Sequence, residues 1–204
     1  MKAIAIIRLS SLGDIVHTLP AFQSLRKNFP AARISWIAEP AGAALLENFP
    51  GIDQILVFDL KARKGWIARI GYLVGFVRRW RRQFDVVLDF QGLIKSALLS
   101  FLLGGSRLGF GFRNARESPA ALFYSRRAAY FPEGRHVIHK NMHLLSQLGI
   151  TSATVEYPVR EWRPSRQLSE FLEQNQLGGK GWVILNVGGG WPSKLLSEKQ
   201  WLQI

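Results

Sequence analysis

The residues with the clearest chemical potential form a polar cluster near the start of the chain. Ser10, Ser11, Gly13 and Asp14 follow an apolar run, residues 2–7, that is typical of a buried parallel strand. Apolar residues at helical spacing come next, so the cluster is a strand-to-helix turn. Such turns lie at the carboxyl ends of the strands in open α/β sheets, where ligands bind. We expect Asp14 at or beside the helix N-cap, either presenting an ionised carboxylate to a ligand or simply capping the helix.

A second turn of this kind lies near the end of the chain. Residues 182–186 form an apolar run that predicts a buried strand, and Gly188 and Lys194 follow it before a helix that begins near Ser197. A strand, a glycine-rich turn, a lysine and a helix can cradle phosphates. The spacing matches neither a Walker motif nor Gly-x-Gly-x-x-Gly, and an ordinary tight turn with a surface lysine would look the same. Gly13, in the first turn, would allow close backbone approach to a ligand or a positive φ.

Positive charge is concentrated in two segments. The net charge is +13, from 27 basic and 14 acidic residues. Residues 61–82 contain eight basic residues and no acidic one, and residues 107–135 contain six arginines against two glutamates. Such a field favours an anionic partner: nucleic acid, an anionic membrane or an acidic substrate. A solvated basic helix face would give the same pattern.

Composition limits the class of protein. The 204 residues include no cysteine, which excludes disulfides and thiolate chemistry. The most apolar stretch, residues 66–77, is too short to span a bilayer and contains Arg69, and the first residues do not resemble a secretory signal, so we expect a soluble or peripheral protein. His139 and His143 stand at helical spacing but have no acidic or thiol neighbours, so we expect no metal site.

Alternation of apolar runs and amphipathic segments predicts a doubly wound parallel sheet. The expected strands are residues 2–7, 33–38, 54–57 and 85–89 and one that begins at 107. The expected helices are residues 15–29, 40–47, 63–83, 93–102, 138–148 and 165–176. We expect residues 110–132 to be an irregular functional segment with a helical turn at 120–124. Residues 149–164 are predicted to be a linker with a strand around Val155.

Four segments, in this order, resemble the motifs of the ADP-heptose:lipopolysaccharide heptosyltransferases, glycosyltransferase family 9. They are residues 8–20, residues 89–97, residues 114–117 with 122–124, and residues 186–201. The similarity is strongest to members that add the first heptose to the Kdo region. The resemblance implies a GT-B architecture of two Rossmann-like domains: an acceptor-binding domain at 1–150, a linker and connecting helix at 151–180, and the beginning of a nucleotide-sugar domain at 181–204.

The resemblance also implies an activity and its residues. The activity is inverting transfer of L-glycero-D-manno-heptose from ADP-heptose to the Kdo inner core of lipopolysaccharide, without a metal or other cofactor. Asp14 matches the catalytic base. The residues assigned to binding of the donor phosphates are Lys194, Gly188 and Gly13. The residues assigned to the acceptor are Ser10, Ser11, Lys61, Arg63, Lys64, Gln91, Lys95 and Arg116. The implied partners are ADP-heptose, a Kdo-lipid A acceptor and the anionic inner-membrane surface, at whose cytoplasmic face the enzyme would work; no nucleic acid is expected.

Two other classes of protein remain open. One is a sugar transferase of the same fold with another donor or acceptor. The other is a non-enzymatic basic module for nucleic acid or anionic membrane, although the aromatic residues alternate with core positions and predict no exposed stacking platform. The sequence stops inside the first helix of the expected second domain. We therefore expect a fragment of a longer enzyme or a truncated reading frame, without transferase activity of its own.

Overall fold

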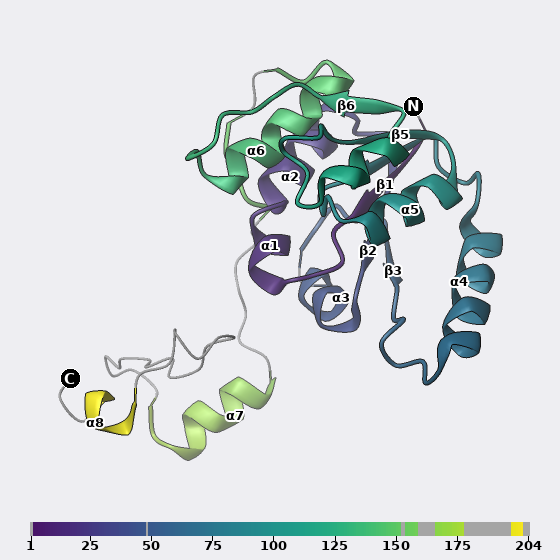
Figure 1. Cartoon of the computed structure of the whole chain (residues 1–204). Helices are drawn as coiled ribbons and strands as arrows, with labels where there is room; N and C mark the ends of the chain where they lie inside the picture. Colours follow the sequence, from purple (N-terminus) through teal and green to yellow (C-terminus); the bar gives the residue numbers. More distant parts are fainter. Residues whose placement is uncertain (1, 48, 152–153, 159–165, 178–196, 202–204) are drawn as a thin grey trace. The chain divides into compact units, whose positions relative to one another are not determined.

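The computed structural model describes residues 2–47, 49–151, 154–158, 166–177 and 197–201. The chain divides into two compact units, residues 1–160 and 161–204, and each is described by itself (Figure 1). In the second unit, the described elements are helices α7 (Arg166–Gln174) and α8 (Glu198–Trp201). The predicted strand at 182–186, with Gly188 and Lys194, lies outside the described residues.

The first unit is built on a parallel sheet of six strands in the order β3-β2-β1-β4-β5-β6. The strands are β1 (Ala3–Ile7), β2 (Arg33–Ala38), β3 (Gln54–Val57), β4 (Val86–Asp89), β5 (Ser106–Phe110) and β6 (Arg126–Ala128). The chain runs outward from β1 to β3, returns to pair β4 with β1, and continues outward to β6. The carboxyl ends of β1 and β4 therefore flank the switch point, which is where doubly wound sheets bind ligands.

Helices cover both faces of the sheet. Successive residues of a strand face opposite sides, so Ile4 and Ile6 join one core cluster while Ala5 and Ile7 join the other. The first cluster is covered by α1 (Leu12–Val16), α2 (Leu19–Asn28), α3 (Pro40–Leu46), α6 (Val137–Leu144) and the 3-10 helix at Leu145–Leu148. The second is covered by α4 (Trp66–Trp80) and α5 (Ile94–Leu103). A further 3-10 helix, Ser118–Phe123, packs beside α5. The predicted fold class is confirmed.

Three predicted elements differ from the structure. The helix expected at 15–29 is two helices, because Pro20 has no amide hydrogen to donate within a continuing helix; it lies instead in the first turn of α2, which begins at Leu19. The segment expected to be irregular contains β6, whose three residues are too few to show a strand pattern. Residues 154–158 form no strand, so the strand predicted around Val155 is wrong.

Helix α4 is shorter than predicted and faces the core differently. Leu73, Val77 and Trp80 pack against the second core cluster as their spacing predicts. Trp66 and Ile70 stand at the same helical spacing, which predicts that they belong to the same apolar side, but they are exposed instead. Within the part of the chain that the structure describes, no helix is long and apolar enough to cross a membrane.

Candidate active site

Asp14 lies within the first turn of α1, at the carboxyl end of β1. Ser11 is the N-cap, and its backbone amide donates a hydrogen bond of 3.3 Å to Asp14 Oδ2. The position at or beside the N-cap was therefore slightly wrong: Asp14 is the third helical residue and completes a capping box. Gly13 does not have a positive φ, and a Cβ there would meet nothing within 4 Å. Conformation alone does not require glycine at position 13, whereas open space beside Asp14 suits a ligand.

Two arginines hold the Asp14 carboxylate. The buried Arg8, one residue beyond β1, places Nη2 2.8 Å from Asp14 Oδ1 and donates from Nη1 to the Phe90 carbonyl. Arg116 Nη1 lies 3.5 Å from Asp14 Oδ2. Burial raises the pKa of Asp14, but the charge of Arg8, the Ser11 amide and the charge of Arg116 outweigh it and hold that pKa below its usual value. The carboxylate is thus ionised at neutral pH.

A small cavity of about 140 Å³ opens beside this carboxylate. Its charged lining residues are Asp14, Arg8, Arg116 and Lys140, which reaches in from α6 with its Nζ 4.9 Å from the centre of the Phe110 ring. Burial, then the charges of Arg8 and Arg116, lowers the pKa of Lys140. Three cations against one carboxylate make the cavity suited to an anionic group. The sequence does not single out Lys140, because the packing of α6 against other elements brings it to Asp14 and no local motif marks it.

Gln91 ties the turn after β4 to the turn after β1. Its buried side-chain oxygen accepts hydrogen bonds from the amides of Leu9 (3.0 Å) and Ser10 (3.4 Å). That oxygen is already used within the protein, so Gln91 has a structural role at the site, in addition to lining the cavity beside Asp14. Ser10 and Ser11, predicted to contact the acceptor, lie on the turn that Gln91 holds.

The buried carboxylate of Asp89 stabilises the turn after β4. Asp89 accepts hydrogen bonds from the Gln91 amide (2.8 Å), the Gly92 amide (3.2 Å) and the Tyr124 hydroxyl (2.8 Å). Burial raises the pKa of Asp89, and burial together with Asp89 raises the pKa of Tyr124. The Tyr124 ring occupies the space beside Gly109, where a Cβ would come within 2.3 Å of it. Tyr124 belongs to the motif segment 122–124, but sequence reasoning predicted no contact of Tyr124 with Gly109 or Asp89, because these contacts join different elements.

The predicted basic residues fall into two groups. Arg116 joins Asp14, as described above. Lys61 and Lys95 meet at Glu39, with Nζ–Oε distances of 2.7 and 3.7 Å, and line a cavity of about 240 Å³ together with Leu9, Phe58, Leu60 and Arg69. Arg63 lies over the Tyr72 ring at 4.7 Å, and Lys64 is exposed. The structure brings Lys61 and Lys95 together and leaves Arg63 and Lys64 on the loop before α4.

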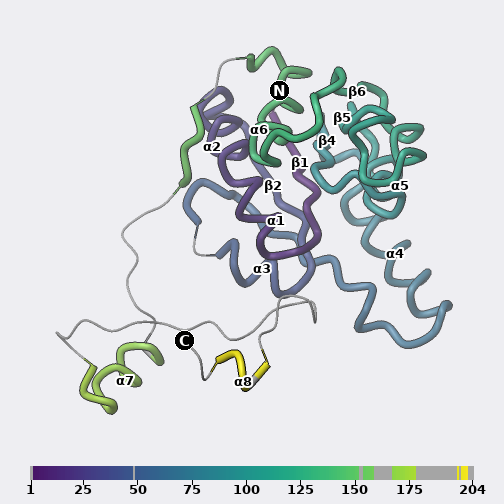
Figure 2. Tube along the Cα trace, turned by 60° about the vertical axis from the view of Figure 1, so that its left-hand side comes forward, coloured from purple at the N-terminus to yellow at the C-terminus, as the bar shows by residue number. Residues whose placement is uncertain are grey.

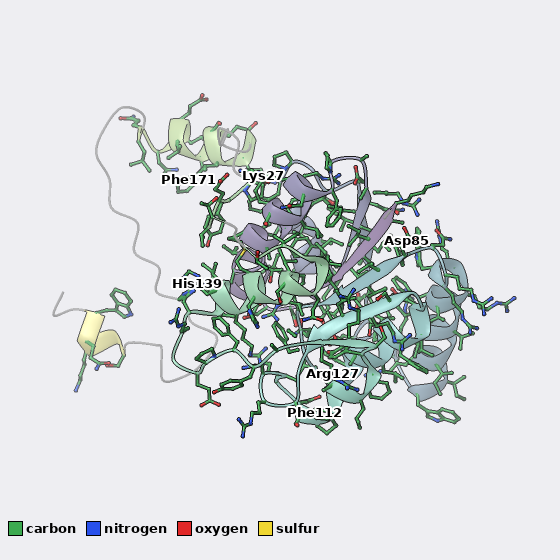
Figure 3. The ribbon with its side chains drawn as sticks, turned by 90° about the horizontal axis from the view of Figure 1, so that it is seen from above. Lys27, Asp85, Phe112, Arg127, His139 and Phe171 are labelled. Atoms are coloured by element: carbon green, nitrogen blue, oxygen red, sulfur yellow. The ribbon has the colours of Figure 1, made fainter. Side chains whose placement is uncertain are left out.

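The two histidines at helical spacing, His139 and His143, line one cavity of about 400 Å³. His143 contacts the Ala129 carbonyl through Nε2, and His139 is exposed on α6 (Figure 3). Among the described residues, no group of three His, Asp or Glu side chains could hold a metal ion.

The chain is similar in sequence and in structure to known lipopolysaccharide heptosyltransferases. The chain is 28% identical over 98% of its length to lipopolysaccharide heptosyltransferase 1 of Pseudomonas aeruginosa, of which it covers 56%. It is 31% identical over 71% of its length to the enzyme of that name from Salmonella typhimurium, of which it covers 47%. In structure it matches E. coli heptosyltransferase WaaC with ADP-2-deoxy-2-fluoro heptose, with a TM-score of 0.67 and 25% identity, covering 76% of this chain and 51% of the other.

The doubly wound sheet, with a carboxylate among cations at its switch point, is the Rossmann-like domain of a GT-B glycosyltransferase. The model of glycosyltransferase family 9 (heptosyltransferase) matches residues 75–203, and the chain belongs to this family. It spans about half the length of the curated relatives it matches. The predicted family is confirmed.

Proposed function

We propose that the protein transfers L-glycero-D-manno-heptose from ADP-heptose to the Kdo inner core of lipopolysaccharide, with inversion and without a metal or other cofactor. Support comes from the family and from relatives named lipopolysaccharide heptosyltransferase 1. The observation that carries the proposal is the Asp14 carboxylate, ionised between Arg8 and Arg116 at the mouth of a cationic cavity.

In this proposal Asp14 is the general base. Its carboxylate takes the proton from the acceptor hydroxyl as that oxygen bonds to the anomeric carbon of the heptose. The bond from the anomeric carbon to the ADP oxygen breaks, and ADP leaves with the electron pair. The lowered pKa of Asp14 keeps the base ionised but weak, so proton transfer accompanies bond formation.

The leaving group and the acceptor would use different cations. Lys194, with Gly188 and Gly13, would contact the donor diphosphate and stabilise the charge that develops on ADP. Arg116 and Lys140 would hold a carboxylate or phosphate of the acceptor near Asp14. Lys61, Arg63, Lys64 and Lys95 would extend this contact along the inner core, with the enzyme at the cytoplasmic face of the inner membrane.

Substitution of the base tests the proposal. In the full-length protein, Asp14→Asn should lower turnover by roughly 10²–10⁴ with little change in melting temperature, since a general base contributes about that much. Asp85→Asn is a matched control: Asp85 accepts hydrogen bonds from the Lys2 and Ala3 amides at the amino end of β1 (Figure 3), and its substitution should leave turnover unchanged. Near-normal turnover of a folded Asp14→Asn variant would show that Asp14 is not the general base and serves only to cap the helix.

A further inference from the structure

Helix α4 carries apolar side chains on two sides. One side packs against the second core cluster through Tyr72, Leu73, Phe76, Val77 and Trp80. On another side stand Trp66, Ile67, Ile70 and Val74, which are 72%, 69%, 52% and 49% exposed. Their spacing places them along one face of the helix. These four residues are called the outer stripe of α4. Scattered exposed apolar residues need no explanation, but an aligned group of this size marks an interaction surface.

No described element of the first unit covers this side of the helix. Figures 1 and 2 both show α4 at the edge of the unit, flanked by α5 and the strands on its inner side only. A Trp side chain that is 72% exposed at the first residue of a helix makes little contribution to the core of its own domain. The stripe therefore contributes little to folding and is available to a partner.

Basic side chains lie at both ends of the outer stripe. Lys61, Arg63 and Lys64 precede α4, and Arg78, Arg79, Arg81 and Arg82 occupy and follow its last turn. Lys61 pairs with Glu39, and Arg79 lies over the Trp80 ring. Residues 61–82 themselves contain no acidic side chain, so no acidic residue of this segment offsets its positive charge. An aligned apolar stripe between two cationic ends is the pattern of a helix that lies in the plane of an anionic bilayer surface.

We propose that the outer stripe of α4 is a membrane-docking surface, which inserts among the headgroups of a bilayer that contains anionic phospholipid. The proposal rests on the proposed function in one respect: docking would bring the lipid-linked acceptor to the loop at 61–64, directly before α4. The 15-residue helix lies on the bilayer and does not cross it. A second copy of the chain is a poor occupant, because the same surface on both copies would oppose two acid-free cationic segments.

Site-specific labelling tests the contact directly, since the chain has no cysteine of its own. The Val74→Cys variant is labelled at the new cysteine with a polarity-sensitive fluorophore. It is then mixed with vesicles of phosphatidylethanolamine, with or without phosphatidylglycerol. Phe112→Cys is the matched control: Phe112 is 47% exposed against 49% for Val74, and Arg127 lies over its ring (Figure 3). We expect a blue shift at position 74 only, and only with phosphatidylglycerol. No shift at 74, or equal shifts at both positions, overturns the proposal.

Vesicle flotation separates the apolar and charged contributions. Trp66→Ser/Ile70→Ser should weaken binding to phosphatidylglycerol vesicles by about tenfold or more, because two side chains no longer leave water. Arg78→Gln/Arg81→Gln should weaken it and reduce its dependence on salt. Unchanged flotation of both folded variants contradicts the proposal, as does a label shift that grows with protein concentration in the absence of vesicles. Turnover on a deacylated acceptor does not need the bilayer. If the wild-type protein binds vesicles as expected but does not turn over this acceptor, the proposed function is wrong and the docking surface is not.

Discussion

At the scale of single residues, burial raises the pKa of Asp14, and the charge of Arg8 is the largest of the contributions that together lower it below its usual value. The two side chains meet at 2.8 Å, while Arg116 is more exposed and stands at 3.5 Å. Because the pKa of Asp14 is lowered, the charged form is favoured, and activity should fall only when the pH drops below the ordinary range of a carboxyl group.

Removal of either arginine should move the acidic limb of the pH profile. Arg8→Gln takes away the nearer cation but leaves the burial that raises the pKa of Asp14, so the acidic limb of kcat/KM should move to higher pH. Arg116→Gln should move it in the same direction by less. The check is kcat/KM against pH for both variants, with folding followed by circular dichroism. Superimposable profiles for the wild type and Arg8→Gln would show that Asp14 is not the titrating base.

Lys140 allows a test of the acceptor side. Lys140→Gln should raise KM for the Kdo-bearing acceptor by about tenfold, with a smaller effect on KM for ADP-heptose, because it removes a charge-assisted contact to an anion. His139→Gln changes the exposed neighbouring side chain and should alter neither constant. If Lys140→Gln raised both KM values equally, the cavity beside Asp14 would not be specific for the acceptor.

At the scale of elements, the Tyr124–Asp89 hydrogen bond connects the sheet to the site. Gly109→Ala would place a Cβ 2.3 Å from the Tyr124 ring, which must then leave Asp89. We expect a loss of about 1–3 kcal/mol in the free energy of unfolding from overpacking, measured by urea denaturation.

A second glycine provides the contrast. Gly75, inside α4, has no neighbour within 4 Å of a Cβ position, so Gly75→Ala should stabilise the protein by about 0.5–1 kcal/mol through helix propensity. Equal effects of the two substitutions would show that Tyr124 is not confined by Gly109.

The elements that sequence patterns predict are those with a clear local period. The strands at 33–38 and 54–57 match β2 and β3, because their β-rich composition and the turns that bound them lie within a few residues. Trp66 shows the limit: helical spacing identifies an apolar side of a helix but not whether the protein or a partner covers it. Asp14 was predicted from its turn. The place of Lys140 in the cavity beside Asp14 instead depends on the packing of α6 against α2 and β5, which no local pattern contains.

At the scale of the whole molecule, three features of the first unit fit the proposed function together. The switch point of the sheet presents Asp14, a cationic cavity lies beside it, and α4 carries an apolar stripe between cations. The net charge of +13 suits the acidic acceptor and the anionic membrane surface that we propose as partners. The donor residues Lys194 and Gly188 lie outside the described residues, and their roles stay predictions.

The most direct measurement of the central claim is heptose transfer by the full-length protein that carries this chain. The purified protein is incubated with ADP-heptose and Kdo-lipid A in the presence of EDTA, and the products are followed by mass spectrometry and by release of ADP. We predict an acceptor heavier by one heptose, ADP in equal amount, and an anomeric configuration opposite to that of the donor. An acceptor of unchanged mass, or transfer that EDTA abolishes, would contradict the account.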